Sequence, residues 1–166
     1  IDTYNNLEIC MKNEEIDAGF VCTSPKYHSE IILKLLKNNI NIFTEINLID
    51  NNYEEIIDLA NKKNIKLFLS STFLYRKEIN FIREKAHKEN NITYRYHTGQ
   101  YLPDWHPWES YKDFFVSDKL TNACREIFAI ELPWIVDAFG EVEEIFTVKN
   151  KVSSLDVDYS DNYSVI

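Results

Sequence analysis

The sequence predicts an α/β protein, in which part of a Rossmann-type parallel sheet is followed by the start of an α+β domain with a largely antiparallel sheet. In the first half, short apolar runs alternate with amphipathic stretches about 10 to 15 residues long, which is the order of βαβ units. After residue 91 apolar and polar residues alternate instead, which is typical of a strand with one exposed face. We therefore expect two domains, at residues 1–75 and 76–166.

In the first domain, the alternation of strand and helix is clearest at residues 17–39. Residues 17–23 are an apolar run, and Ile31, Ile32, Leu35 and Leu36 then recur at helical spacing. Pro25 stands at the start of that helix, where a missing N–H group costs nothing. The expected elements of this domain are a short helix at 3–15, a strand at 17–23, a helix at 24–39, a strand at 41–46, a helix at 51–63 and a strand at 66–71. A helix at about 77–88 is expected after the domain boundary.

The second domain is expected to begin with an alternating strand at 92–96, in which Ile92, Tyr94 and Tyr96 share one side. An aromatic loop and the longest helix follow, and Pro133 inside that helix should kink or divide it. The remaining expected elements are the loop at 103–114, the helix at about 122–139 and two strands at 143–150 and 161–166.

Composition excludes several classes of protein. The 166 residues carry 18 Lys and Arg against 27 Asp and Glu, a net charge of −9, so a basic surface that follows nucleic-acid phosphates is not expected. No apolar run approaches the length of about 18 residues that a membrane span requires. The three cysteines are widely spaced and suggest neither a disulfide framework nor a metal site. We expect a cytoplasmic protein without nucleic-acid or membrane partners.

Glycine is rare, since Gly19, Gly99 and Gly140 are the only three, and no glycine-rich phosphate loop is present. The sequence begins with Ile1 and stops at Ile166 within an expected strand. We expect it to be a fragment of a longer protein.

Two segments at the carboxyl ends of expected parallel strands are candidate ligand sites, because ligands of open α/β sheets bind at that edge. Thr23 and Ser24 offer hydroxyls to a ribose or phosphate, beside the start of a helix. The alternative is that Ser24 only caps the helix and that His28 is a solvated residue of its first turn. One strand later, Glu45 is either a ligand of a ribose or amide group or an ordinary exposed loop acid.

These segments resemble the inositol dehydrogenase and glucose-fructose oxidoreductase (Gfo/Idh/MocA) family. Its dinucleotide domain carries a T-x-P-x-x-x-H motif after one strand and E-K-P after the next. The first stands here as Thr23-Ser24-Pro25 with His28 one residue nearer to the proline, and the second as Glu45-Ile46-Asn47. Residues 99–115 and 125–145 resemble the start of the family's C-terminal domain, especially in members that act on sugar nucleotides in surface-polysaccharide synthesis.

The resemblance implies hydride transfer between NAD or NADP and a sugar or sugar nucleotide. It assigns residues 1–75 to a dinucleotide-binding domain and 76–166 to a substrate and oligomerisation domain, and it implies a homo-oligomer. The cofactor-binding residues it implies are Thr23, Ser24, Pro25, His28, Glu45 and Asn47. Arg76 resembles part of the family's stretch at the junction of its two domains, and we expect it to bind substrate.

Two positions depart from the family. The lysine of E-K-P, which orients or deprotonates the reacting hydroxyl, is Ile46 here. The helix motif D-x-x-x-H falls on Glu126 and Ile130, and a shift of one residue places Glu131 at the histidine position. Glu126 and Glu131 are therefore candidate catalytic residues, because burial can raise the pKa of a carboxyl until it acts as a base.

His106 is the leading substitute for the missing base, since a group with a pKa near neutrality suits removal of the hydroxyl proton. It lies between two tryptophans, and with Asp104 and Trp105 it belongs to a loop suited to cover and stack on a sugar. The alternative is an aromatic loop that plugs the junction between sheets. Arg125 is a candidate ligand of a carboxylate or diphosphate, or else an ion-pair partner of Glu126.

Three functional hypotheses stay open at this point. The first is the oxidoreductase, the second is a catalytically retired relative that binds a nucleotide or a partner protein, and the third is an α/β interaction module without cofactor. Tyr94, Tyr96 and Tyr101 would suit an oligomer interface, unless a helix of the same chain covers them.

Overall fold

The structure is a computed structural model that describes residues 2–89 and 91–166. It divides into two compact units, Ile1–Ser70 and Ser71–Ile166. The division lies five residues before the boundary at 75 that the sequence suggested. Each unit has its own hydrophobic clusters, and each is described by itself.

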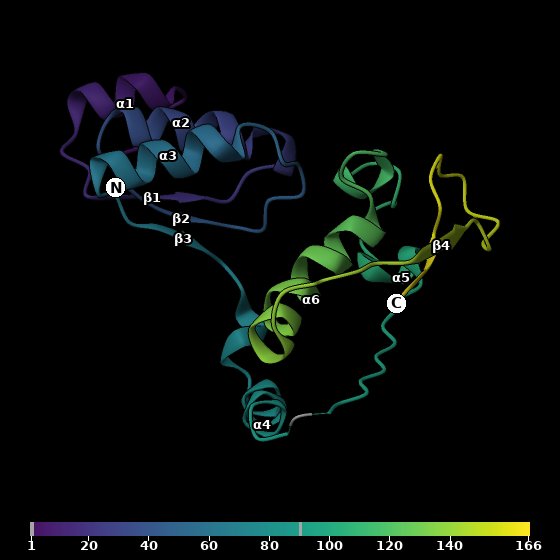
Figure 1. Cartoon of the computed structure of the whole chain (residues 1–166). Coiled ribbons are helices and arrows are strands. Elements are labelled where there is room, and N and C mark those ends of the chain that lie inside the picture. The colour runs from purple at the N-terminus through teal and green to yellow at the C-terminus, as the bar shows by residue number, and fades with distance from the viewer. Residues whose placement is uncertain (1, 90) are drawn as a thin grey trace. The chain divides into compact units, whose positions relative to one another are not determined.

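The first unit is a parallel sheet covered by helices on one face (Figure 1). The strand order β1-β2-β3 follows the sequence, and both pairings are parallel. This arrangement confirms the expected Rossmann-type partial sheet. The elements are α1 (Leu7–Asn13), β1 (Ala18–Val21), the 3₁₀ turn η1 (Pro25–Tyr27), α2 (His28–Lys37), β2 (Asn41–Thr44), α3 (Tyr53–Lys63) and β3 (Leu67–Leu69).

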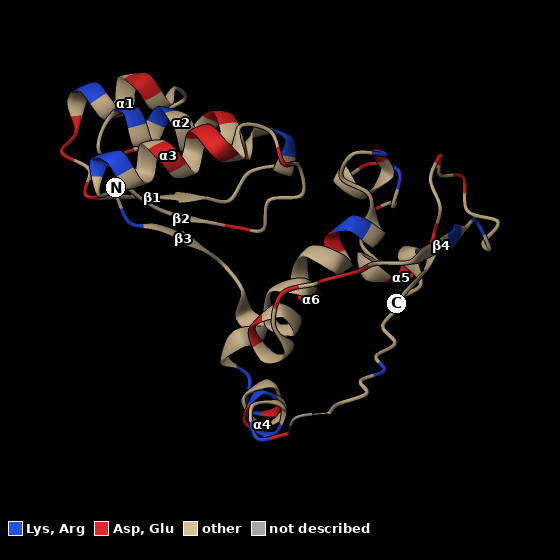
Figure 2. Ribbon diagram, in the orientation of Figure 1, with Lys and Arg blue, Asp and Glu red and all other residues tan. Residues whose placement is uncertain are grey.

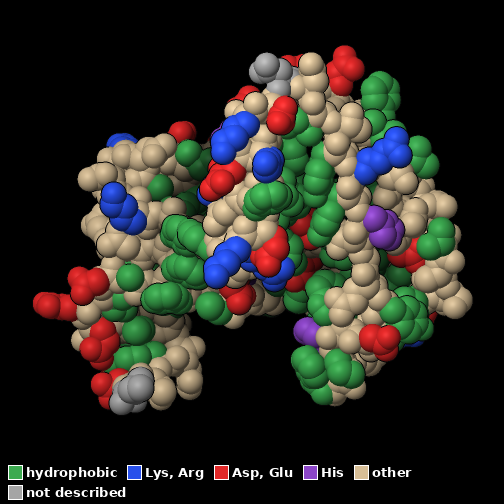
Figure 3. Space-filling model, turned by 90° about the horizontal axis from the view of Figure 1, so that it is seen from below, with side chains coloured by type: hydrophobic (Ala, Val, Ile, Leu, Met, Phe, Trp, Pro, Cys, Tyr) green, Lys and Arg blue, Asp and Glu red, His purple; other side chains and the backbone are tan. Residues whose placement is uncertain are grey.

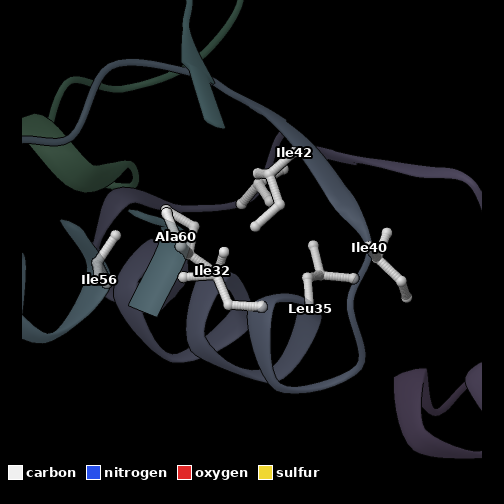
Figure 4. Close-up of a cluster of buried hydrophobic side chains, with 8 residues drawn as sticks. Ile32, Leu35, Ile40, Ile42, Ile56 and Ala60 are labelled. Atoms are coloured by element: carbon white, nitrogen blue, oxygen red, sulfur yellow. The ribbon is translucent and has the colours of Figure 1, made fainter. Parts of the chain in front are cut away.

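The core of this unit lies between the sheet and helices α2 and α3 (Figure 4). Ile32 and Leu35 of α2 meet Ile42 of β2 there, and each of these side chains is buried. A Cβ atom at Gly19 would lie 2.8 Å from Cδ1 of Leu35, so a larger residue at this position would force the buried Leu35 side chain to shift.

The opposite face of the sheet carries a row of aromatic rings. Phe20, Phe43 and Phe68 are in register on adjacent strands, with ring centroids 5.4 and 5.3 Å apart. Phe20 is 73% exposed, and the view from below shows hydrophobic side chains at the surface of this unit (Figure 3). Within the first unit, helices α1, α2 and α3 leave this face uncovered (Figure 1).

The second unit combines a helix pair with a small antiparallel sheet. One cluster joins α4 to α6 through Ile79, Trp134 and Ala138, and another gathers Leu102, Val116, Val157 and Tyr159. Strands β4 and β5 pair antiparallel, as expected for this part of the chain. The elements are η2 (Thr72–Tyr75), α4 (Lys77–Ala86), α5 (Leu102–Trp105), η3 (Phe115–Ser117), α6 (Ala123–Phe139), β4 (Thr147–Asn150) and β5 (Asn162–Val165).

The prediction of a strand at 92–96 is wrong, because these residues have no regular secondary structure. A strand needs a neighbour for its backbone N–H and C=O groups, and β4 and β5 pair only with each other in the described part of the chain. The alternation has another cause. Tyr94 and Tyr96 both pack edge-on against Trp134 of α6, at centroid distances of 5.9 and 5.8 Å.

We expected Pro133 to kink or divide α6, and the helix runs unbroken through this residue, so the division is wrong. Its neighbours Glu131 and Trp134 are both buried, and this packing holds the turn around the missing N–H group. Gly140, with φ of 93°, ends the helix in a conformation that favours glycine. Strand β4 is also shorter than the expected strand at 143–150. In the described residues, no helix combines the length and apolar character that a membrane span needs.

Candidate functional site

The carboxyl edge of the parallel sheet brings together the two predicted ligand segments. Val21, the last residue of β1, is aligned with Thr44, the last residue of β2, so the loops that follow leave the sheet side by side. Thr23 and Glu45 are exposed at this edge. The side chains offered there are hydroxyls, a carboxylate and an amide, which suit the hydroxyls and amide of a nucleotide-like ligand.

His28 braces these two loops. Its side chain is only 1% exposed, Nε2 lies 2.7 Å from the Thr23 carbonyl oxygen, and Nδ1 lies 2.9 Å from Oδ1 of Asn47. The carbonyl can only accept, so Nε2 carries a proton and donates it. A neutral ring then requires the Asn47 amide to turn its NH₂ group toward Nδ1, whereas a charged ring donates to Oδ1. His28 is thus a buried link between the loops, and the solvated alternative is wrong.

Further hydrogen bonds fix the second loop. The Tyr53 hydroxyl donates to the Asn47 carbonyl at 3.2 Å, and the Thr44 hydroxyl donates to the Glu45 carbonyl at 3.0 Å. The Glu45 amide donates to the Val21 carbonyl at 3.1 Å, which ties the loop to β1. The backbone of this edge is therefore pre-organised, while the Glu45 side chain stays available to a ligand.

We expect His28→Ala to lower the free energy of unfolding by about 2–3 kcal/mol, because two hydrogen bonds are lost and a cavity opens. Cofactor affinity should fall with it, because the Thr23 and Asn47 loops lose their link. Urea denaturation and NADH titration measure the two effects. His97→Ala is the matched control, since His97 is exposed and should change neither quantity. Unchanged stability and affinity in His28→Ala would show that the link is not needed.

In the second unit, Glu131 lies in the core between two donors. Its side chain is 6% exposed, Oε1 accepts from the Tyr96 hydroxyl at 2.9 Å, and Oε2 accepts from Nε1 of Trp134 at 2.6 Å. Desolvation and the hydrogen bond to Glu131 raise the pKa of the Tyr96 phenol, and the charge of nearby Arg76 partly offsets them. Of the predicted residues, Glu131 is the one that contacts Tyr96 directly in the described part of the chain.

Sequence reasoning missed Tyr96 and Trp134 as partners of Glu131. Trp134 follows Glu131 by three residues on one helix. This spacing places the two side chains on the same face, so the contact could have been predicted from the sequence. Tyr96 is 35 positions away from Glu131 in the chain, and no local pattern indicates that contact.

His106 is half-buried in a stack of aromatic rings. Its ring lies 4.8 Å from Trp108 and 4.4 Å from Phe114, nearly parallel to both. Nδ1 lies 2.7 Å from Oε1 of Glu109, an arrangement in which Nδ1–H donates to the carboxylate. The lone pair of the neutral ring is then on Nε2, as in a histidine base oriented by an acid.

The other predicted substrate residues are placed separately around this unit. Trp105 packs against the cluster of Leu102 and Val116, whereas Trp108, which the sequence did not single out, is 75% exposed. Asp104 is exposed on α5. The Arg76 guanidinium lies over the Phe73 ring, 3.9 Å from its centroid.

Arg125 and Glu126 stand in the first turn of α6. Arg125 is exposed and lines a cavity, while Glu126 is half-buried where the helix N-terminus favours a carboxylate. Among the described residues, no group of three or more His, Cys, Asp or Glu side chains is arranged to hold a metal ion.

Comparison with known families identifies the first unit. A family model described as an oxidoreductase family with an NAD-binding Rossmann fold, Gfo/Idh/MocA, matches residues 1–71. The first unit thus matches the Gfo/Idh/MocA oxidoreductase family. The match ends one residue after the first compact unit. This confirms the family that the motifs around Thr23 and Glu45 suggested.

Solved structures show the same fold over nearly the whole chain. GenD2 from gentamicin A biosynthesis, in complex with NAD, is 14% identical with a TM-score of 0.72, and the match covers 98% of this chain and 47% of GenD2. A protein described as a probable dehydrogenase from Thermotoga maritima is 15% identical with a TM-score of 0.62, covering 92% of this chain and 46% of that protein. The chain thus spans about half the length of both. No curated protein matches it in sequence.

The residues at the carboxyl edge fit a nicotinamide dinucleotide. Thr23 and Glu45 are exposed there, and the hydrogen bonds of His28, Tyr53 and Thr44 fix the backbone of the two loops. The edge therefore combines exposed polar groups with a fixed backbone, as a site for a polar ligand requires.

Proposed function

We propose that the full-length protein is an NAD- or NADP-dependent oxidoreductase that acts on a hydroxyl or carbonyl carbon of a sugar or sugar nucleotide. The braced carboxyl edge of the sheet, in a unit that matches the Gfo/Idh/MocA family, carries this proposal. A homo-oligomeric state and a role in surface-polysaccharide synthesis belong to the same proposal and derive from the family resemblance. The cytoplasmic location in this proposal derives from the composition of the sequence.

The first unit supplies the cofactor site. Thr23, Ser24, Glu45 and Asn47 would bind the dinucleotide, while Pro25 and His28 hold the shape of the first loop. When bound, the nicotinamide exchanges a hydride with the substrate carbon. The chain itself must then move the proton of the reacting hydroxyl, and Ile46 leaves the family's lysine position without a group that can do so.

We assign the proton transfer to His106. Its Nδ1–H is directed at Glu109, so Nε2 takes the hydroxyl proton during oxidation and returns it during reduction. Glu126, half-buried at the start of α6, is the second candidate for this role. Glu131 has both carboxylate oxygens occupied, and we assign it the positioning of Tyr96 beside the substrate domain's aromatic cluster. Asp104, Arg76 and Trp105 are assigned to the substrate side of the site.

Fewer of the three tyrosines are free to form an oligomer interface than the sequence suggested. Tyr94 and Tyr96 are covered on one side by Trp134, as the alternative interpretation of these residues had it. Tyr101 is exposed and stays a candidate interface residue. Analytical ultracentrifugation of the full-length protein measures the oligomeric state directly.

A retired relative that binds a nucleotide or a partner protein is the second candidate function. Ile46 at the lysine position and the full occupation of Glu131 favour it. The two candidates differ in turnover, which is followed by the absorbance of NADH or NADPH when full-length protein is mixed with candidate sugars and sugar nucleotides. Turnover supports the oxidoreductase. Cofactor binding without turnover of any substrate supports the retired relative, and absence of both contradicts the proposal.

A further inference from the structure

A cavity of about 990 Å³ lies entirely within the second unit, between the start of α6, the β4–β5 sheet and the segment that joins these strands. We propose that it binds the diphosphate group of the substrate, which makes the substrate a sugar nucleotide rather than a free sugar. This inference rests on the proposed function and narrows its substrate class. The cavity volume suits such a ligand, since pockets for small molecules measure roughly 300–1,000 Å³.

The charge of this cavity is opposite to that of the chain. Its wall carries Lys119, Arg125, Lys149 and Lys151 against one acid, Asp158, although the whole sequence has a net charge of −9. Lys and Arg colour the first turn of α6 and strand β4 in Figure 2. Four cations around one concave surface, in an acidic protein, indicate an anionic ligand of more than one charge.

The cations of the wall differ in position: two are exposed lysines, and Arg125 stands at the start of a helix. Lys119 and Lys149 are exposed, and neither takes part in a hydrogen bond or ion pair with its amino group among the described residues. Arg125 presents a planar fork of donors, which suits phosphate oxygens. It stands in the first turn of α6, whose cap Asn122 also lines the cavity, so the positive end of a 17-residue helix adds to the field.

Aromatic side chains form the other part of the wall. Phe128 and Tyr163 meet edge to face at 5.8 Å, and the Tyr159 hydroxyl donates to the Val116 carbonyl at 2.8 Å. Such rings stack on a base or on the apolar face of a sugar, while the cations bind phosphate. A free inorganic anion has no ring or apolar face that could contact this part of the wall.

Asp161 holds the wall in shape. Its carboxylate accepts from the Val152 and Ser153 backbone amides at 2.7 and 3.1 Å and from the Ser153 hydroxyl. Desolvation raises the pKa of this carboxyl, but these hydrogen bonds outweigh it and leave the pKa below its ordinary value. The segment between β4 and β5 that contributes Lys151 and Tyr159 is therefore fixed.

The cavity wall and His106 both pack against one hydrophobic cluster. Val157 and Tyr159 of the cavity wall belong to the same hydrophobic cluster as Leu102 and Val116, against which Phe114 packs. His106 stacks on Phe114. A ligand fixed by its diphosphate is thus bound by the unit that also carries the proposed base.

Isothermal titration calorimetry of the full-length protein, saturated with NADH, tests the proposal with three probes: UDP, inorganic pyrophosphate and uridine. Wild-type protein should bind UDP best, pyrophosphate more weakly and uridine hardly at all. Lys119→Gln/Lys149→Gln should weaken UDP binding about 100-fold, roughly tenfold for each cation. The matched control is Lys77→Gln/Lys88→Gln, which removes the same charge from α4 and its end and should leave UDP binding unchanged.

Three results would overturn the proposal: wild-type protein that binds neither UDP nor pyrophosphate, a cavity variant that binds UDP as tightly as wild type, or UDP that NADH displaces. The NADH titration separates this inference from the function on which it rests. Normal NADH binding with no UDP site contradicts only the diphosphate site, whereas loss of both contradicts the oxidoreductase proposal as well.

Discussion

His106→Ala should reduce kcat for hydride transfer by about 10²- to 10⁴-fold, the usual contribution of a positioned acid or base. The dissociation constant of NADH should not change, because His106 belongs to the second unit and the proposed cofactor residues belong to the first. Steady-state kinetics with the accepted substrate and NADH titration of the same preparation measure both quantities.

Glu109→Gln tests the orientation of the ring. The amide still contacts Nδ1, which lies 2.7 Å from Oε1 of Glu109, but it removes the charge that holds the Nδ1–H tautomer, so kcat should fall by a smaller factor. His97→Ala is the control, since His97 is an exposed histidine of the same unit. Full activity of His106→Ala would remove His106 from the mechanism and favour Glu126.

Trp134→Ala should lower the free energy of unfolding by about 3–5 kcal/mol, the cost of a cavity left by a buried tryptophan. Trp134 is 1% exposed, contacts Tyr94 and Tyr96 through its ring, and donates to Glu131 through Nε1. Its removal leaves one oxygen of a buried carboxylate without a donor, which adds to the cost. Chemical denaturation followed by circular dichroism gives the value.

Two variants separate packing from hydrogen bonding at this position. Trp134→Phe keeps most of the ring contact but loses the donor to Glu131, so we expect a cost of about 1–3 kcal/mol. Trp108→Ala removes a tryptophan that is 75% exposed and should cost less than about 1 kcal/mol. A Trp134→Ala protein as stable as Trp108→Ala would contradict the role of this cluster.

The parallel half of the fold was predictable because its signals are local. Apolar strands, helical spacing and the proline at the start of a helix each lie within one segment, and the right-handed βαβ rule then orders the strands. The edge on which Thr23 and Glu45 meet follows from that topology alone, since β1 and β2 are neighbours.

The errors arise where a contact joins distant segments. Alternation at Tyr94 and Tyr96 resembled a strand, but the two rings share a side because both pack on Trp134. A solvated position in a first turn was one alternative for His28, yet His28 is buried and contacts Asn47, 19 positions later in the chain. Lys149 and Arg125 were not connected in the sequence, since only the fold of the β4–β5 sheet against α6 brings them to one cavity.

The central claim is that the carboxyl edge of the β1-β2-β3 sheet is a nicotinamide cofactor site, and NADH titration of the full-length protein with its Glu45→Ala/Asn47→Ala variant tests it most directly. We predict saturable binding by wild-type protein and binding at least about tenfold weaker in the variant, because hydrogen bonds to the dinucleotide are lost at an exposed edge. The affinity of Lys62→Ala, a change at the exposed end of α3, should equal that of wild type. No saturable binding of NADH or NADPH by wild-type protein, or equal binding by the Glu45→Ala/Asn47→Ala variant, would contradict the account.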